Sequence, residues 1–199
     1  MKRWPADLPR RRRMRSLLGA LCITWTAAFV SAPVVPADQS DARLDSLFER
    51  MRATSDPTEA QSIEREIWRI WVVSKNPTVN DYMAQGIAAL TAGNIDLAIG
   101  FFTKIIELAP DFAEGWNKRA TAHYLNGDFI ASVEDIERTL ALEPRHFGAL
   151  SGMGLIFLNR GDSLGALSAF ERVLEIHPHA RGARQHVPRL RELLKGQGA

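Results

Sequence analysis

Apolar residues recur at helical spacing through most of the chain beyond residue 40. From Ile95 to Leu108, they largely follow the i, i+3, i+4, i+7 order that places side chains on one face of an α-helix. No segment shows the alternation of apolar and polar residues that is typical of a half-buried strand. The pattern therefore predicts an all-α fold.

Glycine and proline residues divide this apolar pattern into segments of helical length. Each pair of segments is separated by a short turn, so we expect the two helices of a pair to be antiparallel. The predicted pairs are about 79–92 with 95–109, 113–126 with 129–142, and 147–160 with 163–176.

The punctuation between these helices is periodic. Pro110, Pro144 and Pro178 follow one another at intervals of 34 residues. A fixed period of this length indicates a stacked repeat architecture. Equivalent positions hold residues of one class: glycine at 93, 127 and 161, a small residue at 86, 120 and 154, and a large apolar residue at 102, 136 and 170.

Each repeated position has a physical reason. Glycine accepts the left-handed conformation that ends the first helix of a pair. The residue after it is Asn94, Asp128 or Asp162, and we expect each to cap the next helix by accepting a hydrogen bond from a backbone N–H. The small residues allow the paired helices to approach closely, and each proline ends a second helix.

Three motifs of the second copy carry a family resemblance: W-x-x-x-A at 116–120, N-G-D at 126–128 and L-A-L-E-P at 140–144. With them, the chain resembles the tetratricopeptide repeat (TPR) family over about residues 77–180. This resemblance implies a TPR-type α-solenoid of antiparallel helix hairpins.

One position departs from the family pattern. The family often has an aromatic residue late in its first helix, and here the three copies have Ala89, His123 and Phe157. We expect His123 to replace the aromatic side chain in packing, rather than to act as an acid or base.

The array needs covered ends, because each repeat buries only one side against its neighbour. Residues 41–75 predict a degenerate capping hairpin, which Asn76-Pro77 closes. We expect Trp68 and Trp71 to pack against the next repeat. Two apolar stripes support the hairpin: Leu44, Phe48 and Met51 form one, and Ile63, Ile67, Ile70 and Trp71 form the other.

The C-terminal segment predicts a second cap. Its apolar stripe contains Ala183, Val187, Leu190 and Leu194, and we expect Pro188 to kink or break the helix near residue 187. The predicted organisation is a signal peptide or anchor at 1–37, the capping hairpin at 38–76, three repeats within 77–180 (79–112, 113–146 and 147–180), and a capping helix and tail at 181–199.

The first 37 residues have the composition of a targeting segment. They hold seven Lys and Arg residues and one acid, and an uncharged apolar run extends from Ser16 to Ala32. Val35-Pro36-Ala37 suits cleavage after Ala37, which predicts a periplasmic protein. The alternative is an uncleaved inner-membrane anchor with the repeats in the periplasm, because about 20 uncharged residues are enough to span a bilayer.

The remaining charge argues against a nucleic-acid partner. Without the first 37 residues, the chain has 18 basic and 22 acidic residues, mixed along the predicted helix faces. The only cysteine of the sequence is Cys22, so the mature chain would have no disulfide, thiolate metal site or cysteine nucleophile.

No constellation of residues predicts catalysis. His177, His179 and His186 are expected to be solvated turn histidines rather than a metal site. Acidic pairs such as Glu134-Asp135, and Glu171 with Glu175, are expected on outer helix faces. We therefore predict no enzyme activity, cofactor, metal or small-molecule substrate. A hydrogen-bonded histidine and carboxylate in a cleft would reopen the hypothesis of a hydrolase.

The resemblance also implies where a protein partner binds. TPR arrays commonly hold an extended peptide or a helix in the concave groove lined by their first helices. Since Met83 and Ile87 stand where related grooves have polar residues of a carboxylate clamp, we predict no such clamp, although Lys118 and Arg119 are nearby in sequence. The groove candidates are Met83, Ile87, Leu90, Asn117, Thr121, Tyr124, Ser151, Leu155 and Leu158.

These features favour a non-enzymatic protein-interaction module, acting as an adaptor or assembly factor for an envelope complex. The alternative is a self-associating structural component of such a complex. An exposed apolar surface around Trp68 and Trp71 would favour that alternative.

Overall fold

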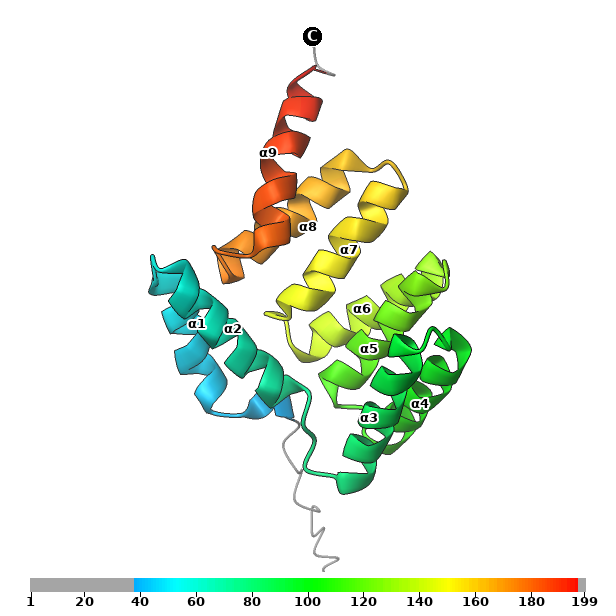
Figure 1. Ribbon diagram of the computed structural model, residues 1–199. Coiled ribbons are helices and arrows are strands. Elements are labelled where there is room, and N and C mark those ends of the chain that lie inside the picture. Colours follow the sequence, from blue (N-terminus) through cyan, green and yellow to red (C-terminus); the bar gives the residue numbers. More distant parts are fainter. Residues whose placement is uncertain (1–37, 197–199) are drawn as a thin grey trace, which may run out of the picture. The chain divides into compact units, whose positions relative to one another are not determined.

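The computed structural model describes residues 38–196, and the predicted targeting segment at 1–37 lies outside the described residues. A short 3-10 helix, Asp38–Ser40, precedes nine α-helices, and this part of the chain contains no strand, which confirms the all-α prediction (Figure 1). The helices are α1 Arg43–Ala53, α2 Pro57–Trp71, α3 Pro77–Thr91, α4 Ile95–Leu108, α5 Ala113–Leu125, α6 Phe129–Leu142, α7 Phe147–Asn159, α8 Ser163–Ile176 and α9 Arg181–Gly196.

Three helix pairs, α3–α4, α5–α6 and α7–α8, follow one another in the array, as predicted (Figure 1). Gly93, Gly127 and Gly161 close the first helix of each pair with φ angles of 76°, 80° and 74°, a conformation that suits glycine. Each of the three repeat prolines follows the end of a second helix. The helices therefore end where the glycine and proline positions of the sequence predict.

The helix caps follow the prediction in two of the three repeats. The Asp128 side chain accepts a hydrogen bond from the Ala131 N–H, and Asp162 accepts one from Gly165. Asn94 makes no side-chain cap bond, so the predicted cap of α4 is wrong. The backbone N–H of Asn94 bonds the carbonyl of Ala89 and closes the end of α3, as the backbone of Asp128 and Asp162 does in the other two repeats.

The small residues at the helix crossings are required by the packing. A Cβ at Gly86 would lie 2.4 Å from the ring of Phe102, and a Cβ at Gly154 would lie 2.7 Å from the ring of Phe170. These distances are too short for a side chain, so the first and third repeats need glycine here.

The N-terminal hairpin, α1 with α2, packs differently from the prediction. Its two apolar stripes are buried, as expected, but they share one core with α7, α8 and α9 rather than with the first repeat. Asn76 and Pro77 do not close this hairpin. Asn76 caps α3 and Pro77 is its first residue, where the missing N–H costs nothing.

Aromatic packing explains why the N-terminal hairpin lies against the third repeat. Trp71 is 1% exposed and Phe48 is fully buried, and both need a wide apolar partner surface. Phe147, Leu150 and Phe170 of the third repeat supply it.

The C-terminal cap is the single helix α9. Ala183, Val187 and Leu190 are buried in the shared core, as the apolar stripe predicts. Pro188 lies inside the helix without breaking it, which corrects the expected break. Pro188 is exposed, so water can satisfy the carbonyl that loses its N–H partner. None of the helices within residues 38–196 has the length and apolar character needed to cross a membrane.

Candidate partner-binding groove

A groove lies between α2, the first half of α7 and the start of α9. We call it the hairpin groove, and its volume is about 870 Å³. Its apolar lining comes from Trp68, Phe147, Gly148, Leu155, Phe170, Ala180 and Ala183. Its polar lining comes from Thr58, Gln61, Glu64, Ser151, His177, His179, Arg181, Arg184, Gln185 and His186, with Pro57 and Gly182 at the edge.

Two of the predicted groove residues line it. Leu155 is 38% exposed and presents its side chain to the groove. Ser151 also lines it, but its hydroxyl donates to the Phe147 carbonyl at 2.7 Å. Leu155 is therefore the predicted residue that is most available to a partner.

The other predicted groove residues do not line the hairpin groove. Met83 is 3% exposed in the core of the first repeat, and Asn117 is 6% exposed and donates to Glu114 at 2.9 Å. Tyr124 packs on Phe129, with ring centroids 5.6 Å apart. The remaining four, Ile87, Leu90, Thr121 and Leu158, do not line the hairpin groove either: Leu90 and Leu158 pack against cores, and Ile87 and Thr121 are exposed.

Trp68 of α2 lines one wall of the groove, and the buried Trp71 packs against it edge to face, with ring centroids 5.4 Å apart. Trp71 stacks on the His146 ring, with centroids 4.1 Å apart and planes 11° apart. Trp68 meets Phe147 edge to face at 5.3 Å, and the Lys118 ammonium lies 5.5 Å from its ring. Trp71 is buried against the array, whereas Trp68 is partly exposed and lines the groove, so apolar surface remains open beside Trp68.

Polar contacts fix the hairpin at its two ends. His177 Nε2 lies 3.3 Å from a Glu64 carboxylate oxygen, and His179 Nε2 lies 3.0 Å from the Thr54 carbonyl. Arg145 donates to Asp45 of α1 at 2.7 Å, and Gln39 hydrogen-bonds the backbone between α4 and α5. The pKa of Glu64 is lowered, mainly by its hydrogen bond with His177.

The histidines near residue 180 are therefore not solvated turn residues, which corrects the sequence-based expectation. His177 is buried, His179 is partly buried, and the His186 ring stacks on Phe170 at 4.7 Å. Within residues 38–196, no group of three or more His, Cys, Asp or Glu residues is placed to hold a metal ion.

Glu114 is a buried carboxylate at the base of the second repeat, and the sequence analysis missed it. His146 Nε2 lies 2.9 Å from one of its oxygens, and the Lys118 ammonium lies 3.0 Å from the other. Burial raises the pKa of Glu114, but His146 and Lys118 together lower it more, so its net pKa shift is downward. The spacing of Glu114 and Lys118, four residues apart on one helix, was the available sequence signal.

The position of Asp135 also differs from the prediction that it lies on an outer helix face. It is buried, not on an outer face, and it accepts two hydrogen bonds of 2.8 Å from the Arg119 guanidinium. His123 lies beside it, with Nε2 3.9 Å from an Asp135 oxygen, at the position where the family often has an aromatic residue.

Two histidine–carboxylate pairs among the described residues lie within hydrogen-bonding distance, and neither histidine is hydrogen-bonded to a nucleophilic side chain. His146 and Glu114 are sealed beneath Trp71. His177 lines the groove, yet no hydroxyl or thiol among the described residues is hydrogen-bonded to its Nδ1. An activated nucleophile would require that contact or its equivalent.

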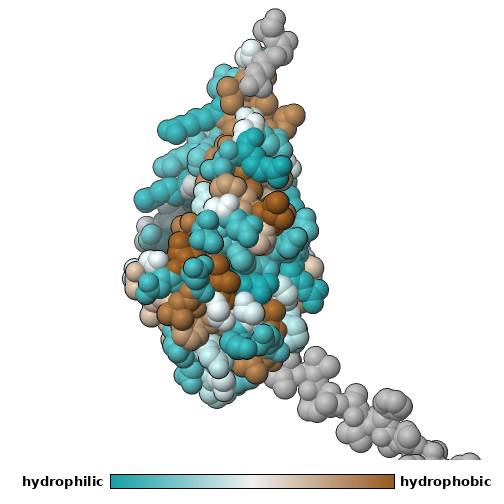
Figure 2. Space-filling model, turned by 90° about the vertical axis from the view of Figure 1, so that its right-hand side faces the viewer, coloured by the Kyte–Doolittle hydropathy of each residue, from teal (hydrophilic) through white to brown (hydrophobic). Residues whose placement is uncertain are grey.

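Apolar side chains are also exposed outside the groove. Leu97, Leu125 and Ile130 lie close to the turns within the repeats and are largely exposed. Figure 2 shows brown hydrophobic patches separated by teal hydrophilic surface on the face that lies at the right of Figure 1. The hairpin groove differs from these patches because apolar and polar side chains from four helices, α2, α7, α8 and α9, converge there.

Comparison with known proteins identifies the repeats. The model of the tetratricopeptide repeat family matches residues 83–129 and 117–181. A TPR repeat-containing protein of Rhizobium etli is 42% identical over 154 residues, which cover 77% of this chain and 76% of that protein.

Two solved structures have the same solenoid fold. The first TPR of Spaghetti (RPAP3), bound to the HSP90 peptide SRMEEVD, has a TM-score of 0.57 and 23% identity, and the match covers 60% of this chain and 94% of that one. The TPR2B domain of yeast Sti1, in a complex with pHsp70, has a TM-score of 0.55 and 17% identity, with coverage of 59% and 99%. At these identities the likeness shows the fold alone.

Proposed function

The chain belongs to the tetratricopeptide repeat family, and from this premise we propose that it is a non-enzymatic module that binds a peptide or a helix of a partner protein. The observation that carries the proposal is the hairpin groove, with its apolar floor and its rim of polar side chains. A concave site of this kind, apolar with a few converging polar groups, is the usual form of a recognition site.

Two structural relatives support a protein partner. One has an HSP90 peptide bound to its TPR domain, and another is in a complex with pHsp70. In this chain α2 stands against the start of α7, so a partner segment would lie between the hairpin and the third repeat. Leu155 and Trp68 would contact its apolar side chains.

We place this module in the bacterial periplasm, where it would act as an adaptor or assembly factor for an envelope complex. The basic start of the chain and the apolar run from Ser16 to Ala32 support export. A fusion of residues 1–37 to a reporter enzyme that is active only outside the cytoplasm tests this location. Activity of the fusion supports export, and its absence excludes it. The mass of the exported protein distinguishes cleavage after Ala37 from an uncleaved anchor.

A photo-crosslinking amino acid at Leu155 tests the binding function in living cells. We expect a distinct crosslinked protein from this position. The matched control is Leu164 of α8, which is more exposed and does not line the groove. Equal crosslinking from both positions, or none from Leu155, would contradict binding in the hairpin groove.

A further inference from the structure

The rim of the hairpin groove carries positive charge that no carboxylate of residues 38–196 neutralises. Arg181 and Arg184 line the groove, both are exposed, and neither forms an ion pair within the described residues. The one carboxylate among the described lining residues is Glu64, which is engaged by His177. The groove is therefore complementary to negative charge.

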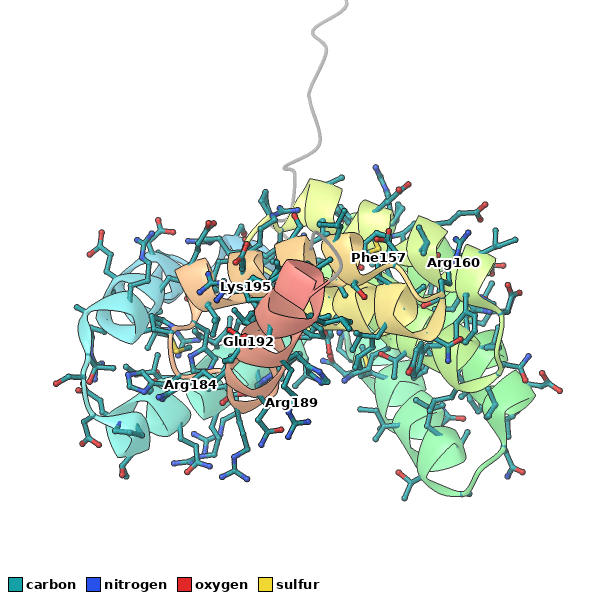
Figure 3. All side chains as sticks on the ribbon, turned by 90° about the horizontal axis from the view of Figure 1, so that it is seen from above. Phe157, Arg160, Arg184, Arg189, Glu192 and Lys195 are labelled. Atoms are coloured by element: carbon teal, nitrogen blue, oxygen red, sulfur yellow. The ribbon has the colours of Figure 1, made fainter. Side chains whose placement is uncertain are left out.

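The two arginines stand at an unusual place in their helix. They lie in the first turns of α9, three residues apart and therefore on one side of it. The positive end of the helix dipole is there, where acidic side chains are normally favoured, but the first turn of α9 holds none. Figure 3 shows Arg184 and Arg189 on opposite sides of α9. Arg189 also has no ion pair among the described residues, but it does not line the groove. The unpaired arginines of α9 that line the groove are therefore Arg181 and Arg184.

Buried polar atoms inside the groove also lack partners. His177 is 2% exposed, and its Nδ1 forms no hydrogen bond among the described residues. The Nδ1 atom of His179 is buried and unpartnered as well. Both residues line the groove next to Arg181. These nitrogens are unpaired beneath the lining of the groove, although buried polar atoms are normally paired, and a ligand reaches them only if the side chains move.

We propose that the hairpin groove binds an acidic segment of a partner protein that also carries a large apolar side chain. Side-chain carboxylates of the segment pair with Arg181 and Arg184, and its apolar side chain packs among Trp68, Phe147 and Leu155. This proposal rests on the proposed function and specifies the chemistry of the partner. The bound segment needs no free carboxyl terminus, which agrees with the prediction that the chain has no carboxylate clamp.

The same observations favour a peptide over a nucleic acid. Residues 38–199 have more acidic than basic side chains, so the domain as a whole repels a polyanion. A phosphate backbone would also leave the apolar floor unused. A peptide with one or two carboxylates and a Leu or Phe side chain matches both parts of a groove of about 870 Å³.

The test uses the purified full chain to select short random peptides displayed on phage without a free carboxyl terminus. We expect the enriched peptides to combine Asp or Glu with Leu, Phe or Met. Synthetic peptides made from them, amidated at the carboxyl terminus, should bind R181Q/R184Q about tenfold or more weakly than wild type. The matched control is R189Q, a charge on the far side of the same helix, which should bind like wild type.

Each outcome decides the proposal. Enriched peptides without acidic residues overturn the proposal, and so does equal peptide binding by R181Q/R184Q and wild type. In either case the proposed function stands if Leu155→Glu still abolishes peptide binding. Binding of a nucleic-acid oligomer in place of acidic peptides also overturns the proposal. Failure to enrich any peptide overturns the proposed function together with this inference.

Discussion

Gly148 is the residue on which the fit of the N-terminal hairpin depends. A Cβ at this position would lie 2.6 Å from the tip of the Trp68 ring, and a shift of that ring would disturb its contacts with Trp71, His146 and Phe147. The absence of one methyl group therefore permits the contact between α2 and α7.

We expect Gly148→Ala to lower the free energy of unfolding by about 1–3 kcal/mol, the usual cost of overpacking. Urea denaturation followed by tryptophan fluorescence measures it. Gly152→Ala is the control, because its Cβ would lie 3.4 Å from Ile136, an ordinary contact distance, and alanine favours the helix. A loss of stability as large in the control would contradict the role of Trp68.

The Arg119–Asp135 pair is the second residue-scale case. Asp135 is buried and accepts two of the three hydrogen bonds that the guanidinium donates, so removing the arginine leaves an uncompensated charge. We expect Arg119→Met to lower the free energy of unfolding by about 3–5 kcal/mol, measured by urea denaturation.

Arg138→Met provides the control for this pair. Arg138 is exposed on the same helix as Asp135 and lies over Trp116 at 5.7 Å, so its loss should cost about 1 kcal/mol or less. The double variant Arg119→Met with Asp135→Leu should recover much of the stability, because it removes both charges. If the double variant is as unstable as Arg119→Met, the buried charge is not the cause.

At the scale of elements, the docking of α2 depends on pH. The folded pKa of Glu64 is lowered by His177, so the charged carboxylate stabilises the folded state above the unfolded pKa of about 4.5. This contribution is lost as the pH falls through the folded pKa. We expect weaker protection of the α2 amides below about pH 4.5 than at neutral pH, measured as the exchange rate relative to the intrinsic rate of an unfolded chain at the same pH.

Two variants of α2 check this expectation. Glu64→Gln should reduce the pH dependence of exchange in α2, since amide side chains do not titrate. Glu59→Gln should leave the docking contact unchanged, because Glu59 pairs within the hairpin, with Arg50 and Thr54. The same pH dependence in all three proteins would contradict the role of Glu64.

At the scale of the whole described molecule, residues far apart in sequence form one core. The hairpin at the start of this region packs with the third repeat and α9, and not with the repeat that follows it in sequence. A substitution that destabilises the hairpin should therefore also destabilise the third repeat.

We expect Trp71→Ala to lower the free energy of unfolding by about 3–5 kcal/mol and to accelerate amide exchange in α7 and α8. Hydrogen exchange with mass spectrometry locates the effect. The first repeat, α3 with α4, is the internal control, because its core is separate. Faster exchange confined to α3 and α4 would instead support a hairpin stacked on the first repeat.

The sequence alone determined the helices, their turns and the repeat register, because these depend on short-range chemistry. A positive φ at glycine, a cap at Asp128 or Asp162, and a proline after a helix act within a few residues. The apolar stripes of the hairpin and of α9 were also predictable, since each lies within one helix.

Only the tertiary structure decided where those stripes pack and which polar side chains they bury. Glu64 and His177 are 113 residues apart in sequence, and Glu114 and His146 are 32 apart, so no local pattern brings them together. The same holds for the hairpin groove, whose wall and floor come from opposite ends of the array. An apolar helix face predicts that the face is buried, but not which element covers it. The hydrophobic effect is non-directional, so the complementary shape of the packed side chains determines the partner.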